Sequence, residues 1–378
     1  MTPNPNPHEA EQTRAPIGES VQNLQRSHEQ GANEDLPAAL SDFYRNEIAP
    51  VLPPKILDFH THTWSAENWK EKPWEVGKTG GQYMVTDEFY PPERLLQDGR
   101  ACFPGRDYQA VCFGYPTPAT DWELDTAYVA EAARRHAGLW PLVLAGPDLG
   151  LSRQRYERAL AEGRFYGFKV FLNWYGDNYG ERQVEDMLGP TEISLANERR
   201  LVVVLHVPGR GRLADPRTQA GVQWLSRACP AGQIVLAHCG RCYLPSEMKA
   251  AIACLRGLPN VWMDTSMVMD PLVLQMVLNE IGPHRLLFGT DFPVAAMCGR
   301  RVQVMDHWVD VVLPGYPPSA YRVPGDSIHA GFMAWEIVLA IRWACEMAGV
   351  TTAERAGIFY DNGMGLLQGV TRKGSILT

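Results

Sequence analysis

Short apolar runs alternate with longer amphipathic segments along most of this chain. From Lys55 onward, eight runs have the length and the apolar composition of buried strands. The expected strands are Ile56–Phe59, Ala110–Phe113, Trp140–Leu144, Gly167–Phe171, Leu201–Leu205, Gln233–Ala237, Val261–Asp264 and Leu286–Gly289. From the second run onward the starts are 25 to 34 residues apart. This is the length of one strand with its following helix, so the pattern predicts a parallel α/β protein.

Segments with helical periodicity fill the gaps between these runs. The expected helices are Asp125–Ala137, Arg153–Gly163, Thr218–Ala228, Ser246–Leu258, Pro271–Gly282 and Trp335–Val350. Eight strand–helix units close most readily into a (β/α)8 TIM barrel. The alternative, a doubly wound sheet, would need a glycine-rich turn after the first strand. Here the first run is followed by His60-Thr61-His62 without a glycine, which favours the barrel.

The chain is expected to have one main domain and a short extension. Residues 1–50 are polar and predict a partly flexible N-terminal extension with a short helix around Leu36–Ile48, whereas residues 51–378 form the barrel. Two gaps, 63–109 and 292–331, are too long for simple loops and follow strand ends. Long loops at this end of a barrel usually bind or cover a ligand. Among their aromatic and histidine residues, Trp64 and His329 are the expected substrate contacts.

Composition narrows the classes of partner. Across 378 residues, 35 basic and 43 acidic side chains give a net charge of −8, which argues against a nucleic-acid partner. No apolar run approaches the ~18 residues that would span a bilayer, so no membrane association is expected. The start of the chain has no secretory signal. With eight cysteines in so long a chain, this predicts a reducing, cytoplasmic location. The pair Cys239 and Cys242 has metal or redox spacing but lacks a second pair, so that reading carries little weight.

Polar residues with metal-binding chemistry gather at the ends of the apolar runs. His60 and His62 end the first run, and residues two apart in an extended segment point to the same side. His206, His238 and Asp291 end later runs. A single such histidine is more often structural, and a single aspartate is often a helix cap. Four histidines and one aspartate at the same ends instead predict one site at the barrel mouth, suited to zinc or a similar ion.

Several of these segments together resemble the amidohydrolase superfamily, in particular its amidohydrolase-2 branch. The matching segments are Leu57-Asp58-Phe59-His60-Thr61-His62, Gly167-Phe168-Lys169, Leu205-His206, Ala237-His238-Cys239-Gly240, Phe288-Gly289-Thr290-Asp291-Phe292-Pro293 and Asp361-Asn362-Gly363. The branch usually has Ala after that Asn, so Gly363 is a departure. The resemblance spans about 55–367.

The resemblance implies one or two divalent metals, most often zinc, at the mouth of a distorted barrel. His60, His62, His206 and Asp291 would bind the metal, and His238 would be a catalytic group beside it. Lys169 would be a further ligand if it is carboxylated and bridges two ions. An unmodified Lys169 fits a single ion, and one ion is expected because the branch is mostly of that kind.

The function that follows is a metal-dependent hydrolase of a small amide, lactam, lactone or related carbonyl substrate. A divalent ion lowers the pKa of bound water from about 15.7 towards 7. Asp291 would act as general base and then general acid, while His238 or the metal would polarise the scissile carbonyl. The alternative is a non-oxidative decarboxylase of the same branch, which resembles aminocarboxymuconate semialdehyde decarboxylase. A third possibility, a binding protein on an inactive barrel, is disfavoured because every ligand position is filled. The partner is expected to be a small molecule, and a homo-oligomer is possible.

Overall fold

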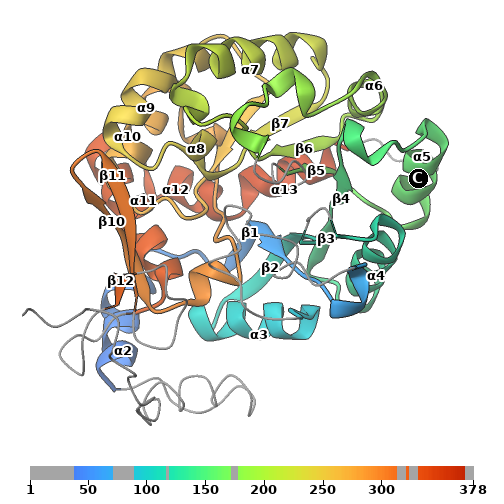
Figure 1. Cartoon of the computed structure of the whole chain (residues 1–378). Helices are drawn as coiled ribbons and strands as arrows, with labels where there is room; N and C mark the ends of the chain where they lie inside the picture. The colour runs from blue at the N-terminus through green and yellow to red at the C-terminus, as the bar shows by residue number, and fades with distance from the viewer. Residues whose placement is uncertain are drawn as a thin grey trace, which may run out of the picture.

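Parallel strands ring the centre of the molecule, and helices cover them on the outside (Figure 1). The structure is a computed structural model that describes residues 38–70, 89–115, 119–171, 178–312, 321–322 and 331–370. One sheet has the order β1-β2-β3 and a second has the order β4 to β9. The strands are β1 Lys55–His62, β2 Asp107–Phe113, β3 Leu139–Pro141, β4 Val143–Ala145, β5 Gly167–Val170, β6 Val202–Leu205, β7 Gln233–Leu236, β8 Val261–Asp264 and β9 Leu286–Leu287.

Backbone hydrogen bonds close the two sheets into one barrel. At one seam, the Phe59 N–H donates to the Phe288 carbonyl at 2.7 Å, and the His62 N–H donates to the Phe292 carbonyl at 2.9 Å. At the other seam, β3 and β4 are two halves of one expected strand, interrupted at Leu142, whose N–H donates to the Cys112 carbonyl at 2.9 Å. Counted this way, the barrel has the eight expected strand positions. The predicted fold class is confirmed.

The helices lie at the outside of this ring. Their bounds are α2 Ala38–Phe43, α3 Pro92–Cys102, α4 Trp122–Arg135, α5 Arg153–Glu162, α6 Pro190–Arg199, α7 Pro216–Ala228, α8 His238–Arg241, α9 Pro245–Ala251, α10 Pro271–Ile281, α11 Met333–Ala348, α12 Thr352–Phe359 and α13 Asp361–Gln368. Helices α4, α5, α7, α10 and α12 begin at a side-chain cap. The carboxylate of Asp121 accepts from the N–H groups of Glu123 and Leu124, so α4 begins three residues before its expected start. Asp215 and Asp270 cap α7 and α10 in the same manner.

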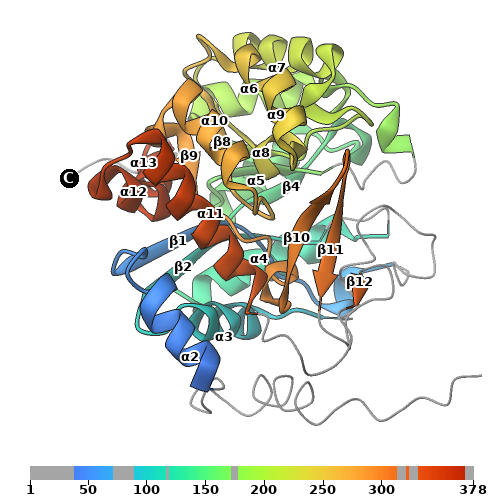
Figure 2. The same ribbon diagram turned by 90° about the vertical axis from the view of Figure 1, so that its left-hand side faces the viewer.

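The two segments expected as long loops contain regular structure. Helix α3 lies inside 63–109; its start at Pro91-Pro92 looks like a turn in the sequence, but proline suits the first helical position. Inside 292–331, β10 (Gly299–Val304) and β11 (His307–Val312) form an antiparallel hairpin, which stands beside the barrel (Figure 2). β11 also pairs with the two-residue β12 (Tyr321–Arg322). The polar hairpin strands are mostly exposed or half-buried, so they lack the apolar signal of the barrel strands.

The described part of the N-terminal extension packs against the barrel. Helix α2 continues into a π-helical turn over Tyr44–Ile48. The Tyr44 hydroxyl donates to the Pro104 carbonyl at 2.8 Å, and its ring lies 5.7 Å from that of Trp335 on α11. Residues 1–37 lie outside the described residues. The division of the chain near residue 50 stays a prediction.

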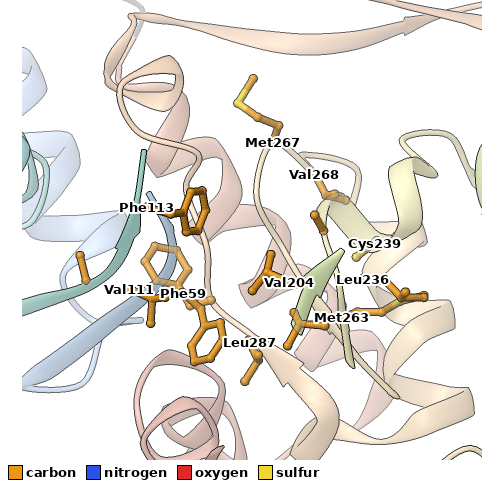
Figure 3. Packing of buried hydrophobic residues seen from close by; sticks show 14 of the residues in the cluster. Phe59, Val111, Phe113, Val204, Leu236, Cys239, Met263, Met267, Val268 and Leu287 are labelled. Atoms are coloured by element: carbon orange, nitrogen blue, oxygen red, sulfur yellow. The ribbon is translucent and has the colours of Figure 1, made fainter. Parts of the chain in front are cut away.

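Apolar side chains from the barrel strands form a continuous core. Figure 3 shows members of this cluster from β1, β2, β6, β7, β8 and β9 packed together. The labelled strand residues are Phe59, Val111, Phe113, Val204, Leu236, Met263 and Leu287. This core holds the strand ends, and with them the polar residues of the mouth, in fixed positions. Within the described ranges, no helix has the length and apolarity needed to cross a membrane.

Candidate functional site

Side chains from five strand ends meet at one end of the barrel. The His60 ring centroid lies 5.7 Å from that of His62 and 4.7 Å from that of His238, which in turn lies 4.8 Å from that of His206. The Nζ atom of Lys169 lies 2.9 Å from His60 Nε2. All of these groups, with Asp291, come from positions that the sequence places at strand ends or just beyond them. The structure therefore brings the expected histidines, the lysine and the aspartate together.

His60 is fixed by a carboxylate behind it. Its Nδ1–H donates to Asp264 Oδ2 at 2.9 Å, and both side chains are fully buried. The pKa of Asp264 is lowered to about 2, because the attraction of His60, His238 and the Ser266 hydroxyl outweighs the opposing effect of burial. An ionised Asp264 can only accept hydrogen bonds, so the proton of His60 lies on Nδ1. Its Nε2 therefore presents a lone pair towards Lys169 and, at 3.6 Å, towards Asp291 Oδ1.

His62 has the same orientation for a different reason. Its Nδ1–H donates to the Gly114 carbonyl at 3.0 Å, which leaves Nε2 without hydrogen and 3.3 Å from Asp291 Oδ1. Burial lowers the pKa of His62, although Asp291 opposes this. A neutral imidazole with its outer nitrogen fixed by a hydrogen bond is the usual form of a metal-binding histidine.

His238 is also neutral and held from behind. Its Nδ1–H lies 3.1 Å from the Ser266 carbonyl and 2.8 Å from the Ser266 hydroxyl, and its backbone N–H donates to Asp264 Oδ1 at 2.8 Å. Burial lowers its pKa to about 3. In this form Nε2 accepts a proton and cannot donate one. This form of His238 suits a role as proton acceptor, and its expected role in polarising a carbonyl stays a prediction.

His206 differs from the other three histidines in the surroundings of its Nδ1. Its Nδ1 is buried and has no hydrogen-bond partner among the described residues. The ring lies edge-on to Phe171, at 4.6 Å, and to His238. Burial lowers its pKa well below the usual value, and the nearby charge of Arg241 acts in the same direction. A buried nitrogen without a partner is unfavourable unless another group binds it.

Asp291 faces the imidazoles from the opposite side. Its backbone N–H donates to the His60 carbonyl at 2.8 Å, and its left-handed conformation (φ +74°) directs the carboxylate across the strand ends. Asp291 lies against the rings of His238, His62 and His60, and its pKa lies below the usual range although burial alone would raise it. Asp291 is therefore a carboxylate at neutral pH. It is partly accessible, with 17% of its side chain exposed.

Lys169 lies at the centre of the barrel and is fully buried. Burial lowers its pKa to about 7, although the charges of Asp264 and Asp291 oppose this. Its Nζ lies over the rings of Phe113 and Phe171, at 4.4 and 5.1 Å. Near neutral pH a substantial fraction of Lys169 is the free amine, which is the form that reacts with CO2 to give a carbamate.

Three supporting residues are absent from the candidates derived from the sequence. Asp264 and Ser266, at and after the end of β8, orient His60 and His238. Asp58 accepts from the Thr290 N–H at 2.9 Å and from the Tyr108 hydroxyl at 2.9 Å, and so ties β1 to the segment that carries Asp291. The signal for Asp264 is its place at the end of an apolar run, the same signal that identified the histidines.

Of the two expected substrate contacts, Trp64 and His329, the structure describes only Trp64. His329 lies outside the described residues. Trp64 is fully buried and packs against Tyr115, with 5.1 Å between the ring centroids, and Tyr115 in turn lies 5.8 Å from His62. Trp64 is thus separated from the histidines by one aromatic ring. Its contact with substrate stays a prediction.

The Cys239–Cys242 pair shows no sign of metal or redox chemistry. Both thiols are buried and free, and burial raises the pKa of Cys242 to about 12. Thiols that stay protonated at neutral pH are poor nucleophiles and metal ligands. The one group of potential metal donors found among the described residues is His60, His238 and Asp291, whose ligand atoms all lie within 4.8 Å of one another.

The donor groups of this site suit a divalent ion. Three imidazoles have their Nδ1–H groups occupied and their Nε2 lone pairs directed inwards, a fourth has a free nitrogen, and a carboxylate faces them. Imidazole nitrogen with carboxylate oxygen is a donor set that zinc prefers. The ligand set expected from the sequence stays a proposal, because the donors that lie within 4.8 Å of one another include His238 and neither His62 nor His206.

The comparisons with known proteins agree with this fold. The sequence model of a family described as amidohydrolase matches residues 57–363. A search of curated proteins found no match. Among solved structures, an amidohydrolase from Burkholderia multivorans, seen with bound HEPES and with bound zinc, is 18% identical and has a TM-score of 0.55. That match covers 83% of this chain and 99% of the other.

Two further structures have the same architecture. Amidohydrolase 2 from Bifidobacterium longum subsp. infantis is 15% identical, with a TM-score of 0.51 and coverage of 84% and 99% of the two chains. A 2,6-dihydroxybenzoate decarboxylase in complex with 2,6-dihydroxybenzoate is 14% identical, with a TM-score of 0.50 and the same coverage. At these identities the likeness establishes the fold.

Proposed function

The chain belongs to the amidohydrolase family, and on this premise we propose that it is a metal-dependent hydrolase of a small amide, lactam, lactone or related carbonyl substrate. The observation that carries the proposal is the orientation of the histidines. His60 and His62 each have Nδ1–H bound to a fixed acceptor and Nε2 within 3.6 Å of one oxygen of Asp291. Such second contacts are what orient metal-binding histidines.

We assign the metal to His60, His62, His206 and Asp291. His206 is included because its buried Nδ1 has no partner among the described residues, a cost that coordination would remove. When bound, the divalent ion supplies Lewis acidity and acidifies water towards neutral pH. One zinc ion is proposed; two would require a carboxylated Lys169.

Asp291 and His238 then handle the proton. Asp291 is ionised and accepts the proton of the attacking water, and it later donates that proton to the leaving group. His238 is neutral with Nε2 open as an acceptor, so it orients the water or takes a proton from it. Both groups are fixed by backbone or side-chain hydrogen bonds, which reduces the reorganisation needed on reaction.

A decarboxylase is the second candidate. The 2,6-dihydroxybenzoate decarboxylase has the same fold, and a decarboxylase would use the same groups with the proton moving in the opposite direction, onto carbon. The hydrogen bond from Nδ1 to the Ser266 carbonyl leaves Nε2 of a neutral His238 as an acceptor, so His238 would have to take up a proton before it could give one to carbon. This favours hydrolysis over decarboxylation.

The test is a reaction screen of the protein after it has been stripped of metal and reloaded with zinc. Lactones and amides are assayed by acid release in a weakly buffered indicator solution, and aromatic acids by CO2 release. Hydrolysis that is lost on stripping and restored by zinc supports the proposal. CO2 release without hydrolysis of any lactone or amide favours the second candidate, and no metal-dependent turnover of either kind contradicts both.

A matched pair of variants separates the roles of two histidines. His206→Asn should lose bound zinc, whereas His238→Asn should retain zinc but lose turnover by about 10²–10⁴-fold. Loss of zinc in His238→Asn with retention in His206→Asn would exchange the two assignments.

A further inference from the structure

Three arginines meet on one side of the proposed metal site, around the ring of Tyr243. Arg212 follows β6, Arg241 ends α8 and Arg301 lies in β10. The guanidinium carbon lies 4.5 Å from the centre of the Tyr243 ring for Arg301 and 5.6 Å for Arg212. The Tyr243 ring lies 6.2 Å from the ring of His238. We call Arg212, Arg241, Tyr243 and Arg301 the arginine cluster; it borders the proposed reaction site.

Two of the three positive charges are neutralised within the protein. Arg301 forms two parallel hydrogen bonds with Asp310, both at 2.9 Å, and Arg212 lies 2.7 Å from Glu247. These pairs fix the geometry of the cluster and neutralise the charges of Arg212 and Arg301. The carboxylates of Asp310 and Glu247 already occupy N–H groups of Arg301 and Arg212 that could otherwise bind an external anion.

Arg241 is different because no carboxylate among the described residues pairs with it. Its Nη1 donates to the carbonyls of Val207 and Gly209, at 3.0 and 3.2 Å, and its guanidinium lies 5.5 Å from the ring of Tyr179. Burial lowers its pKa, and its charge contributes to the low pKa of His206. Arginine stays charged in proteins, so an uncompensated positive charge lies close to the site. Neutral carbonyls offset only part of the cost of burying it.

The backbone holds Arg241 in this position. His238, Cys239, Gly240 and Arg241 all have left-handed φ angles, of +55°, +50°, +68° and +63°. This turn follows β7 directly, so the residue that faces the metal site and the arginine lie only three positions apart. A left-handed conformation is unfavourable at the three non-glycine residues, and such backbone strain clusters where ligands bind.

We propose that Arg241 binds a carboxylate that the substrate carries apart from its reacting carbonyl group, so that the enzyme acts on anionic carbonyl compounds. This inference rests on the proposed function and narrows its substrate class. Nη1 of the guanidinium donates to the Val207 and Gly209 carbonyls, and a further hydrogen bond joins Arg241 to the Tyr179 side chain, so some of the five N–H groups remain for an external acceptor. A guanidinium matches the planar geometry of a carboxylate. The flanking rings of Tyr179 and Tyr243 suit a flat organic acid.

The test compares the binding of two probes to zinc-loaded protein by isothermal titration calorimetry. Isophthalate has two carboxylates; 3-carbamoylbenzoate retains one for the metal and replaces the other with a neutral amide. The wild type should bind isophthalate about 10–30-fold more tightly. In Arg241→Gln the ratio of the two affinities should fall to about one. Arg241→Lys keeps the positive charge but not the planar set of donors, so its ratio should lie between those of Arg241→Gln and the wild type. Zinc content is measured for each variant.

The control is Arg210→Gln, which removes the same charge from the neighbouring loop. The Arg210 side chain is 78% exposed and pairs with Glu181, so the preference should stay unchanged. Equal binding of the two probes by the wild type would overturn the inference, as would a preference that survives in Arg241→Gln. If Arg241→Gln does not fold, the test rests on the affinity ratio of the two probes in the wild type and on its decrease in Arg241→Lys. Because binding is measured, the inference can fail while metal-dependent hydrolysis is observed, and it can hold while hydrolysis is not.

Discussion

Replacement of Asp264 by asparagine should weaken zinc binding although Asp264 is not a proposed ligand. Asp264 is ionised and fully buried, and its Oδ2 accepts the Nδ1–H of His60 at 2.9 Å. In Asp264→Asn an amide NH2 or a weaker neutral carbonyl faces that nitrogen. The NH2 orientation forces the His60 proton to Nε2, where it blocks the lone pair directed at the metal site. The carbonyl orientation places the NH2 against the His238 backbone N–H, which now donates to Asp264 Oδ1 at 2.8 Å.

Either rearrangement removes one well-oriented imidazole. Loss of such a supporting contact typically reduces metal affinity by about 10–100-fold, or about 1.4–2.8 kcal/mol. The assay is competition for zinc against a chromophoric chelator at pH 7.5. Asp270→Asn is the matched control, because Asp270 caps α10 through the Leu272 N–H at 2.8 Å and is not in contact with the histidines. Zinc affinity of folded Asp264→Asn equal to that of the wild type would refute the role assigned to His60 and Asp264.

Three further outcomes are expected. Asp291→Asn should retain most of the metal but lose turnover by about 10²–10⁴-fold, measured on zinc-loaded protein with a substrate found in the screen; unchanged turnover would exclude a proton-transfer role. Lys169→Ala should leave zinc content near one equivalent by elemental analysis; about two equivalents in the wild type, falling on substitution and partly restored by a short carboxylic acid, would instead indicate a carboxylated lysine between two ions. Asp125 has a pKa raised by burial from 3.8 to about 7, so folding favours its protonated form, and the stability it contributes is lost as the pH rises from about 4 to about 7. Asp125→Asn should therefore be more stable than the wild type at pH 8, by of the order of 2–4 kcal/mol, and equal to it near pH 4; a difference independent of pH in urea unfolding would contradict this.

Much of the barrel could be predicted because its strands are continuous apolar runs at regular spacing. The run Trp140–Leu144 shows the limit: the structure divides it at Leu142 into β3 and β4, a break that depends on the seam between two sheets. Helix α3 was hidden by Pro91-Pro92, which suits either a turn or a helix start. To recognise α3 as a helix, one must know which parts of the folded chain pack against it.

The histidines and Asp291 could be found because strand ends of a parallel barrel meet at one mouth, whatever their separation along the chain. Asp264 had the same signal, yet its role depends on contact with His60, 204 residues away. Arg241 had no signal in the sequence. Its importance comes from burial and from the absence of a carboxylate partner among the described residues, both of which are properties of the folded chain.

The central claim is that one divalent ion binds at the mouth of the barrel between β1 and the segment after β9. Its most direct test is an anomalous difference map, collected at the zinc absorption edge from crystals of zinc-loaded protein. The map should contain one strong peak about 2.0–2.2 Å from His60 Nε2, His62 Nε2 and a carboxylate oxygen of Asp291. A peak elsewhere in the molecule, or none at these residues in protein shown to contain zinc, would contradict the claim.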